Sequence, residues 1–166
     1  MQIETATPAD FVRWLDLAAE VEHLFGPMVG EESFRQALVD AIDGQRAFCT
    51  REGNGTPGSR LCGGVVIDHA CNGIEWLAVV QDYRGKRVGR SLLQFAVSHL
   101  DPAREVVVQT FAPGVPEGAA ARHLYLSLGF RDRTPADPTP AGIPTVHMAR
   151  PHMLRGAESS GPAIRS

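Results

Sequence analysis

The residues with the clearest chemical potential form a basic turn that follows an apolar strand and leads into a helix. Four bases and no acid occupy this turn, and its two glycines let the backbone come close to a ligand. The first amides of a helix lack partners and lie at the positive end of its dipole. The turn therefore predicts a pyrophosphate site, and an ordinary turn with a solvated basic rim is the alternative. The predicted site consists of Arg84, Gly85, Lys86, Arg87, Val88, Gly89 and Arg90.

A carboxylate also stands out within the apolar strand that precedes this turn. Glu75 lies two residues before Leu77, and a period of two places Glu75, Leu77 and Val79 on one face of the strand. Carboxylates are unusual at such positions. Glu75 can relay a proton through water, or it can form an ion pair with one of the many arginines. The sequence leaves both alternatives open.

These groups need a scaffold, and the hydrophobic pattern predicts helices packed on one sheet. Apolar residues at helical spacing predict helices over residues 8–24, 31–43 and 118–128, and a further helix after Gly89. Apolar and β-branched runs predict strands over residues 2–5, 46–51, 61–68, 74–80, 105–111, 130–133 and 145–149. The resulting order, β-α-α-β-β-β-α-β-α-β-β, predicts an α+β or α/β domain around one mixed sheet.

Two segments resemble the signatures of the GCN5-related N-acetyltransferases, the GNAT superfamily. The run Arg84–Gly89 is similar to Q/R-x-x-G-x-G/A, with Arg87 at the position of the first Gly. The run Ala121–Phe130 is similar to A-x-x-L-Y-x-x-x-G-F, and Gly118 stands where family members often have Asn. The order of elements resembles the family fold over about residues 2–150. The resemblance implies a three-layer domain with a mixed, mostly antiparallel central sheet between helices.

The resemblance implies an N-acetyltransferase that moves the acetyl group of acetyl-CoA to a primary amine of a small molecule or protein, by direct attack in a ternary complex. The pyrophosphate would lie on the basic turn, and the pantetheine arm would run beside Leu77, Ala78 and Val79. Tyr125, with a phenol reference pKa of about 10, would protonate the departing thiolate, and Glu75 would relay a proton. A catalytically silent CoA-binding or regulatory module is the alternative, since two positions depart from the family pattern.

The resemblance places the acceptor against the connection between the first two helices, Phe25–Val29. Residues 1–44 hold nine acids and two bases, a net charge of −7. An acidic wall would favour a cationic amine by electrostatic attraction. The alternative is that the acids only solubilise two surface helices. The acids that flank the connection are Glu20, Glu22, Glu31 and Glu32.

Length and composition limit the remaining classes. The 166 residues fit one domain, predicted over residues 1–153, and the small polar residues 154–166 predict a disordered tail. A net charge of −3 argues against nucleic-acid binding, and no apolar run is long enough to span a membrane. Three cysteines without ligand spacing, and no signal peptide, predict a cytoplasmic protein without a metal. All bases but Lys86 are arginines, which is typical of a protein from a GC-rich bacterial genome. Domains of the GNAT family often form pairs, so the resemblance implies that a homodimer is possible.

Overall fold

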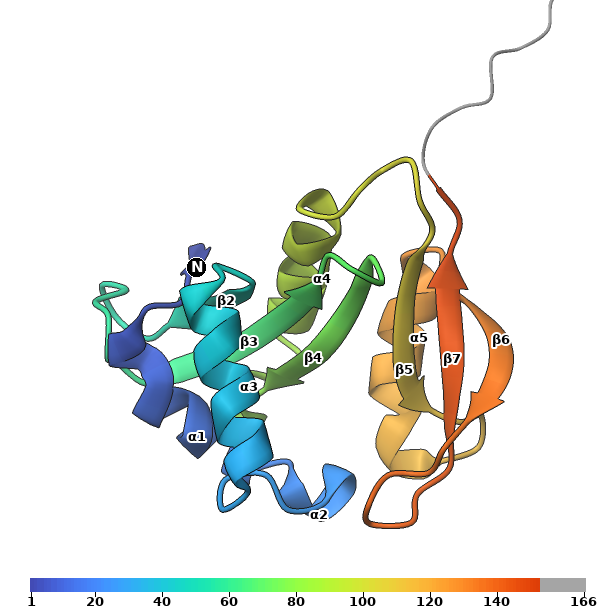
Figure 1. Ribbon diagram of the computed structural model, residues 1–166, viewed down its shortest axis with the longest axis horizontal. Helices are drawn as coiled ribbons and strands as arrows, with labels where there is room; N and C mark the ends of the chain where they lie inside the picture. Colours follow the sequence, from blue (N-terminus) through green and yellow to red (C-terminus); the bar gives the residue numbers. More distant parts are fainter. Residues whose placement is uncertain (153–166) are drawn as a thin grey trace, which may run out of the picture.

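The computed structural model describes residues 1–152 and contains one seven-stranded sheet (Figure 1). The strand order is β1-β2-β3-β4-β5-β7-β6, and every neighbouring pair is antiparallel except β4 and β5. The prediction of a mixed, mostly antiparallel sheet is therefore confirmed, while the predicted tail lies outside the described residues. The strands are β1 Ile3–Thr5, β2 Ala47–Arg51, β3 Leu61–Asp68, β4 Gly73–Val79, β5 Val106–Phe111, β6 Arg131–Ala136 and β7 Thr145–Arg150.

Helices cover both faces of the sheet and give the domain three layers (Figure 1). One apolar core joins α1 and α3 to the sheet, and a second core joins α4 and α5 to the opposite face. None of the helices formed by residues 1–152 is long and apolar enough to span a membrane. The helices are α1 Phe11–Ala19, α2 Glu22–Phe25, α3 Glu32–Asp43, α4 Val88–Ser98 and α5 Ala119–Ser127, with 3-10 turns η1 Pro8–Asp10, η2 Gln81–Tyr83 and η3 Pro116–Gly118.

Two glycines in β3 allow helices to approach the sheet closely from both sides. A Cβ atom at Gly64 would lie 2.7 Å from the ring of Trp14, which is fully buried in α1. A Cβ atom at Gly63 would lie 2.9 Å from Leu92 Cδ1 of α4. Side chains at these positions would push the layers apart, so the pair of glycines sets how tightly the three layers pack.

The parallel strands β4 and β5 separate soon after they meet. Their register contains two pairs, Gly73 with Val107 and Ile74 with Val108. Beyond Ile74, β4 pairs with β3 alone, and β4 and β5 diverge (Figure 1). The β4 edge that faces β5 therefore leaves backbone N–H and C=O groups without a strand partner. Such an edge can accept an extended ligand as an added strand.

The helix predicted over residues 8–24 is interrupted. A 3-10 turn precedes α1, and the helix stops before Val21, whose φ and ψ of −112° and 2° are not helical. Val21 is buried in the core, and the Glu22 carboxylate accepts hydrogen bonds from the backbone N–H groups of Met28 and Val29, at 2.8 and 2.7 Å. The apolar spacing was predicted correctly, but these tertiary contacts redirect the chain into the short helix α2.

A buried ion pair fastens the N-terminal segment to the edge of the sheet. Asp10 is fully buried and accepts two hydrogen bonds from the Arg51 guanidinium, at 2.9 and 2.7 Å. The backbone N–H groups of Gly58 and Thr7 donate to the same carboxylate. Burial raises the pKa of Asp10, but the hydrogen bonds from these partners and the Arg51 charge outweigh it, so the net pKa is well below its usual range. The carboxylate is therefore charged and fully paired inside the protein.

Candidate functional site

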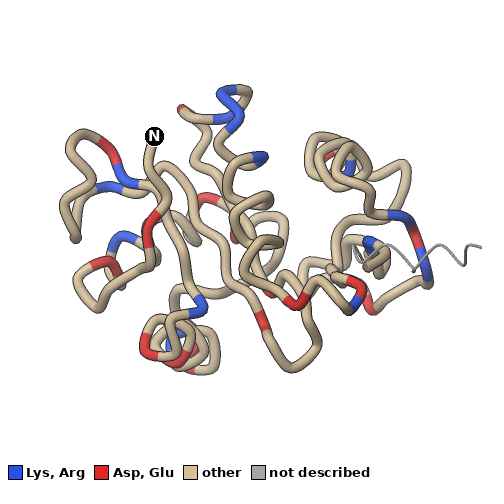
Figure 2. Tube along the Cα trace, turned by 90° about the horizontal axis from the view of Figure 1, so that it is seen from above, with Lys and Arg blue, Asp and Glu red and all other residues tan. Residues whose placement is uncertain are grey.

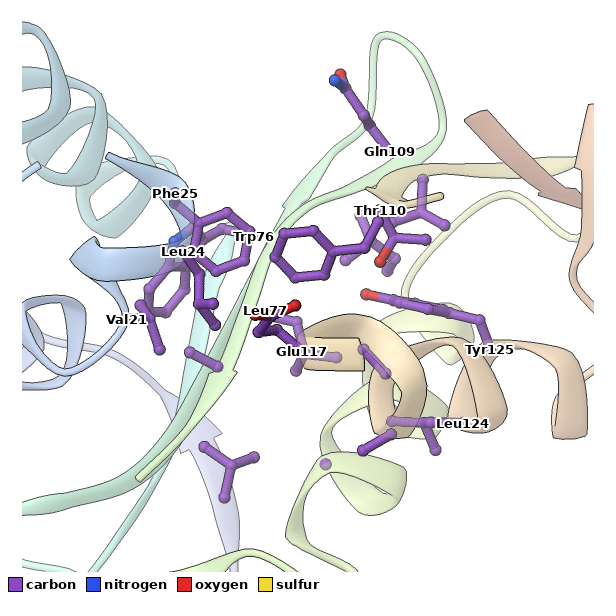
Figure 3. A pocket seen from close by; sticks show the side chains of 18 of the residues that line it. Val21, Leu24, Phe25, Trp76, Leu77, Gln109, Thr110, Glu117, Leu124 and Tyr125 are labelled. Atoms are coloured by element: carbon purple, nitrogen blue, oxygen red, sulfur yellow. The ribbon is translucent and has the colours of Figure 1, made fainter. Parts of the chain in front are cut away.

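A cavity of about 660 Å³ opens where β4 and β5 diverge (Figure 3). This volume is typical of pockets for small molecules, about 300–1,000 Å³. Its walls come from β4, the start of α4, β5 and α5, and from the segments around α2 and between β6 and β7. The cavity brings together most of the residues that the sequence predicted for the site.

The basic turn forms one end of this cavity. Of its seven residues, all but Lys86 line the cavity, and the ammonium group of Lys86 lies 4.9 Å from the centre of the Tyr83 ring. Arg84 donates to the carbonyl oxygen of Val79 and Arg90 to the hydroxyl of Ser127. Within residues 1–152, no acid lies within ion-pair distance of these bases, and the turn is a patch of positive charge (Figure 2).

The backbone conformation at Arg87 accounts for the glycine that the resembled family pattern has at this position. It is the N-cap residue of α4 and has a φ of 64°, in the left-handed region that favours glycine. A side chain in this conformation costs of order 1 kcal/mol. The chain therefore keeps the backbone conformation that points the first amides of α4 outward, and adds a guanidinium at the same point.

Leu77, Ala78 and Val79 line the cavity along the free edge of β4. Glu75 also lines it, but a β-bulge interrupts the expected alternation at this residue, since Val66 pairs with Trp76 and Ile67 pairs with Ile74. Ile74 consequently packs in the same core as Leu77 and Val79.

The carboxylate of Glu75 is engaged in an ion pair. Its Oε2 atom lies 3.1 Å from Arg46 Nη1, and about half of the side chain is exposed, at 47%. The ion-pair alternative that the sequence left open is therefore present in the structure. Glu75 also lines the cavity, so it is placed where a proton relay would need it. Its role in proton relay stays a prediction.

Tyr125 lies in the wall formed by α5. Its side chain is buried, its ring packs edge-on against Phe130 with centroids 5.3 Å apart, and its hydroxyl points into the cavity near Thr110 (Figure 3). Burial raises the pKa of the phenol above its ordinary value. The hydroxyl therefore stays protonated and can donate a proton or a hydrogen bond to a group in the cavity.

The glycine at position 118 is required by packing. A Cβ atom there would lie 2.3 Å from the Cβ atom of Phe111, which belongs to β5. An Asn at this position, as the resembled family often has, would collide with Phe111. The Phe111 side chain therefore fills the space that the Asn side chain would need, which accounts for the glycine at position 118.

The acidic wall expected near Phe25–Val29 does not line the cavity. Val21, Leu24 and Phe25 line it instead (Figure 3). The Phe25 ring stacks on Phe111 with 5.2 Å between centroids. Glu22 binds backbone amides, which lower its pKa, and Glu20 accepts a hydrogen bond from the backbone N–H of Gln81. These two carboxylates stabilise the loops around α2, and the side chains that face the cavity here are apolar.

Sequence reasoning missed several polar residues that line the cavity, among them Gln109 and Glu117. Gln109 lines the cavity and donates hydrogen bonds to the carbonyl oxygen of Asp137 and to Thr145 Oγ1, at 3.1 and 2.9 Å. Glu117 lies in η3 directly before α5 and projects toward Leu77 on the opposite wall (Figure 3). The position of Glu117, four residues before the A-x-x-L-Y signature that begins at Ala121, is the one signal that could have identified it.

Comparisons with known proteins agree with this arrangement. A family profile described as an acetyltransferase (GNAT) domain matches residues 43–132, more than half of the chain. A search of curated proteins found no match.

Solved structures with the same fold include three acetyltransferases. A GNAT-family acetyltransferase from Bacillus cereus is 18% identical, with 93% of this chain and 98% of that chain covered and a TM-score of 0.68. The ribosomal-protein-S18-alanine N-acetyltransferase of Escherichia coli is 20% identical, with 95% and 97% covered and a TM-score of 0.67. A putative acetyltransferase of Salmonella typhimurium, solved with its cofactor acetyl-CoA, is 16% identical, with 97% and 99% covered and a TM-score of 0.67.

Proposed function

Because this chain belongs to the GNAT acetyltransferase family, we propose that it transfers the acetyl group of acetyl-CoA to a primary amine. One observation carries this proposal: a single cavity joins the basic turn, the free edge of β4 and the hydroxyl of Tyr125. These three features match the three parts of acetyl-CoA that must be held, namely the pyrophosphate, the pantetheine arm and the thioester.

The residues of the cavity suit the binding of acetyl-CoA. The first amides of α4 and the bases of the run Arg84–Arg90 would hold the pyrophosphate. The backbone groups of Leu77, Ala78 and Val79 that point away from β3 would pair with the amides of the pantetheine arm, with Arg84 moving off the Val79 carbonyl oxygen that it binds in the structure. This arrangement would place the thioester between β4 and β5, next to Tyr125.

The proposed reaction is a direct attack of the amine on the thioester carbonyl. The amine must be neutral, so it loses one proton, through water and with Glu75 as the proposed relay. The new C–N bond forms, the C–S bond breaks, and Tyr125 donates its proton to the departing thiolate. The nitrogen gives up a second proton as the amide forms, and that proton, passed through water, restores the Tyr125 phenol. Burial raises the pKa of the Tyr125 phenol, and a thiolate that departs into the same cavity would also lose hydration, which would raise its own affinity for a proton.

Release of free thiol from acetyl-CoA in the presence of a pool of amines tests this function. We expect thiol release that depends on the amine and an acceptor that gains the mass of one acetyl group. Binding of CoA without thiol release for any amine would contradict the proposal. That result would favour a catalytically silent CoA-binding module.

Replacing Arg87 by glycine should separate cofactor binding from folding. We expect an Arg87→Gly variant to bind CoA about 10-fold more weakly, because a charge-assisted hydrogen bond to phosphate is lost. Its thermal stability should not fall, because glycine adopts the left-handed conformation freely. Calorimetric titration with CoA and thermal unfolding measure the two effects.

A matched control is Gln45→Gly, which changes another residue with positive φ, 55°, that does not line the cavity. This variant should bind CoA as the wild type does. Wild-type affinity in the Arg87→Gly variant would show that the guanidinium has no part in phosphate binding.

A further inference from the structure

The end of the cavity opposite the basic turn is apolar. We call this end the acceptor chamber and define it by the side chains of Val21, Leu24, Phe25, Phe111, Pro138 and Pro140, all of which line the cavity. The charged residues that line the cavity, namely Glu75, Glu117 and the arginines of the basic turn, lie outside this set. A second charge on an acceptor would therefore lose its hydration here without gaining a partner, which is costly.

Two contacts close the acceptor chamber across the gap between the halves of the sheet. The rings of Phe25 and Phe111 stack with centroids 5.2 Å apart and planes at 28°. Gly26 approaches Pro140 so closely that a Cβ atom on Gly26 would lie 2.7 Å from Pro140 Cβ. The segment around α2 and the loop between β6 and β7 thus approach each other across the gap between the halves of the sheet (Figure 1). This bridge limits the length of an acceptor on the side of the cavity formed by Phe25 and Pro140.

One carboxylate beside the acceptor chamber is available to an incoming amine. Glu75 is occupied by Arg46, as described above. Glu117 lines the same cavity, and within residues 1–152 the structure records neither an ion pair nor a hydrogen bond for its side chain. Glu117 and the hydroxyl of Tyr125 project toward the same space (Figure 3). Within the described part of the chain, the cavity therefore offers one unpaired carboxylate, that of the exposed residue Glu117, beside the apolar acceptor chamber.

We propose that the acceptor is a small primary amine with an apolar aliphatic or aromatic body, and that Glu117 receives its ammonium group. The inference rests on the proposed function and names its substrate class. The apolar body would lie against the side chains of the acceptor chamber, while the ammonium group pairs with Glu117 before it loses the proton. Polyamines and polypeptides are disfavoured, the first by uncompensated charge and the second by the bridge.

Four acceptors test the proposed class: 2-phenylethylamine, hexylamine, spermidine and a short peptide with a free N-terminus. We expect kcat/KM, measured by thiol release from acetyl-CoA, to be at least 10-fold higher for the two apolar monoamines than for the other two. A higher value for spermidine or for the peptide would overturn the proposal, and would indicate a charged or an open acceptor site respectively.

A Glu117→Gln variant tests the role of the carboxylate. We expect KM for 2-phenylethylamine to rise about 10-fold, while kcat and the dissociation constant of CoA stay within twofold of the wild type. Inhibition by 2-phenylethanol, which has the same body without the charge, should be unchanged. The control Glu32→Gln makes the same substitution at the start of α3, outside the cavity, and should have no effect.

Equilibrium binding separates this inference from the proposed function. Calorimetric titration of 2-phenylethylamine into CoA-saturated protein should show binding that Glu117→Gln weakens, whether or not turnover occurs. Binding without any thiol release would contradict the transferase function and leave the amine site standing. An unchanged affinity in Glu117→Gln would overturn the assignment of the carboxylate.

Discussion

A Tyr125→Phe variant is expected to lose about 100-fold in kcat, because a positioned proton donor contributes about 10²–10⁴-fold to a reaction of this kind. Its dissociation constant for CoA should stay unchanged, since the substitution removes one hydroxyl from a wall that keeps its shape. Initial rates of thiol release and calorimetric titration with CoA measure the two quantities. Retention of more than half of the wild-type kcat would exclude Tyr125 as the proton donor.

The other tyrosine of the chain, Tyr83, provides a matched control. Tyr83 also lines the cavity, but it lies in η2 at the end that carries the basic turn. A Tyr83→Phe variant removes the same hydroxyl group from a place away from the proposed thioester, and should keep its kcat. The dependence of the rate on pH is a second measurement. The pKa of the Tyr125 phenol is raised above its ordinary value of 10.0, so the phenol is still protonated at that pH. Deprotonation of Tyr125 should therefore cause no loss of rate below about pH 10.

An Asp10→Asn variant is expected to lose about 3–5 kcal/mol of unfolding free energy. The substitution removes the buried one of the two carboxylates that pair with Arg51, whose side chain is 2% exposed, and leaves only the half-exposed Glu4. It also turns an amide N–H₂ toward the guanidinium. Urea denaturation monitored by circular dichroism measures the change. The control Asp16→Asn breaks the exposed pair between Arg13 and Asp16, and should cost less than about 1 kcal/mol. A loss below 1 kcal/mol for Asp10→Asn would contradict a stabilising role of the buried pair.

The Asp10 pair also predicts how stability depends on pH. The pKa of Asp10 is lower in the folded protein than the ordinary carboxyl value of 3.8 that applies to the unfolded chain. Its contribution is therefore complete above about pH 5 and decreases as the pH falls. The unfolding free energy of the wild type should decline more steeply below that pH than that of Asp10→Asn. Equal slopes would show that Asp10 does not contribute.

The sequence was sufficient for features that local patterns encode. Apolar spacing located the main helices and strands, and the run Arg84–Arg90 identified the positively charged start of α4. Both features depend on neighbours within one or two turns of the chain, so a window of sequence contains the physical cause. The apolar face of residues 8–24 was likewise correct, although Val21 and Glu22 interrupt that helix through contacts made elsewhere.

Features that depend on register or on distant partners could not be predicted in this way. The bulge at Glu75 depends on how β4 pairs with β3, and no residue type in β4 marks it. The partners Asp10 and Arg51 are 41 positions apart, and each resembles an ordinary surface residue in the sequence. Glu117 belongs to a segment that reads as a loop, and it becomes a site residue because η3 directs it across the gap between the strands.

The divergence of β4 and β5 has a consequence for how such a protein can evolve. The proposed donor site uses the edge of β4 and the start of α4, which are held by the sheet and by a buried core. The acceptor chamber takes much of its wall from the segment around α2 and from the loop that joins β6 to β7. Loops tolerate insertions and substitutions better than strands do. Changes in these loops can therefore alter which amine is accepted, while the proposed thioester site on β4 and α4 stays the same.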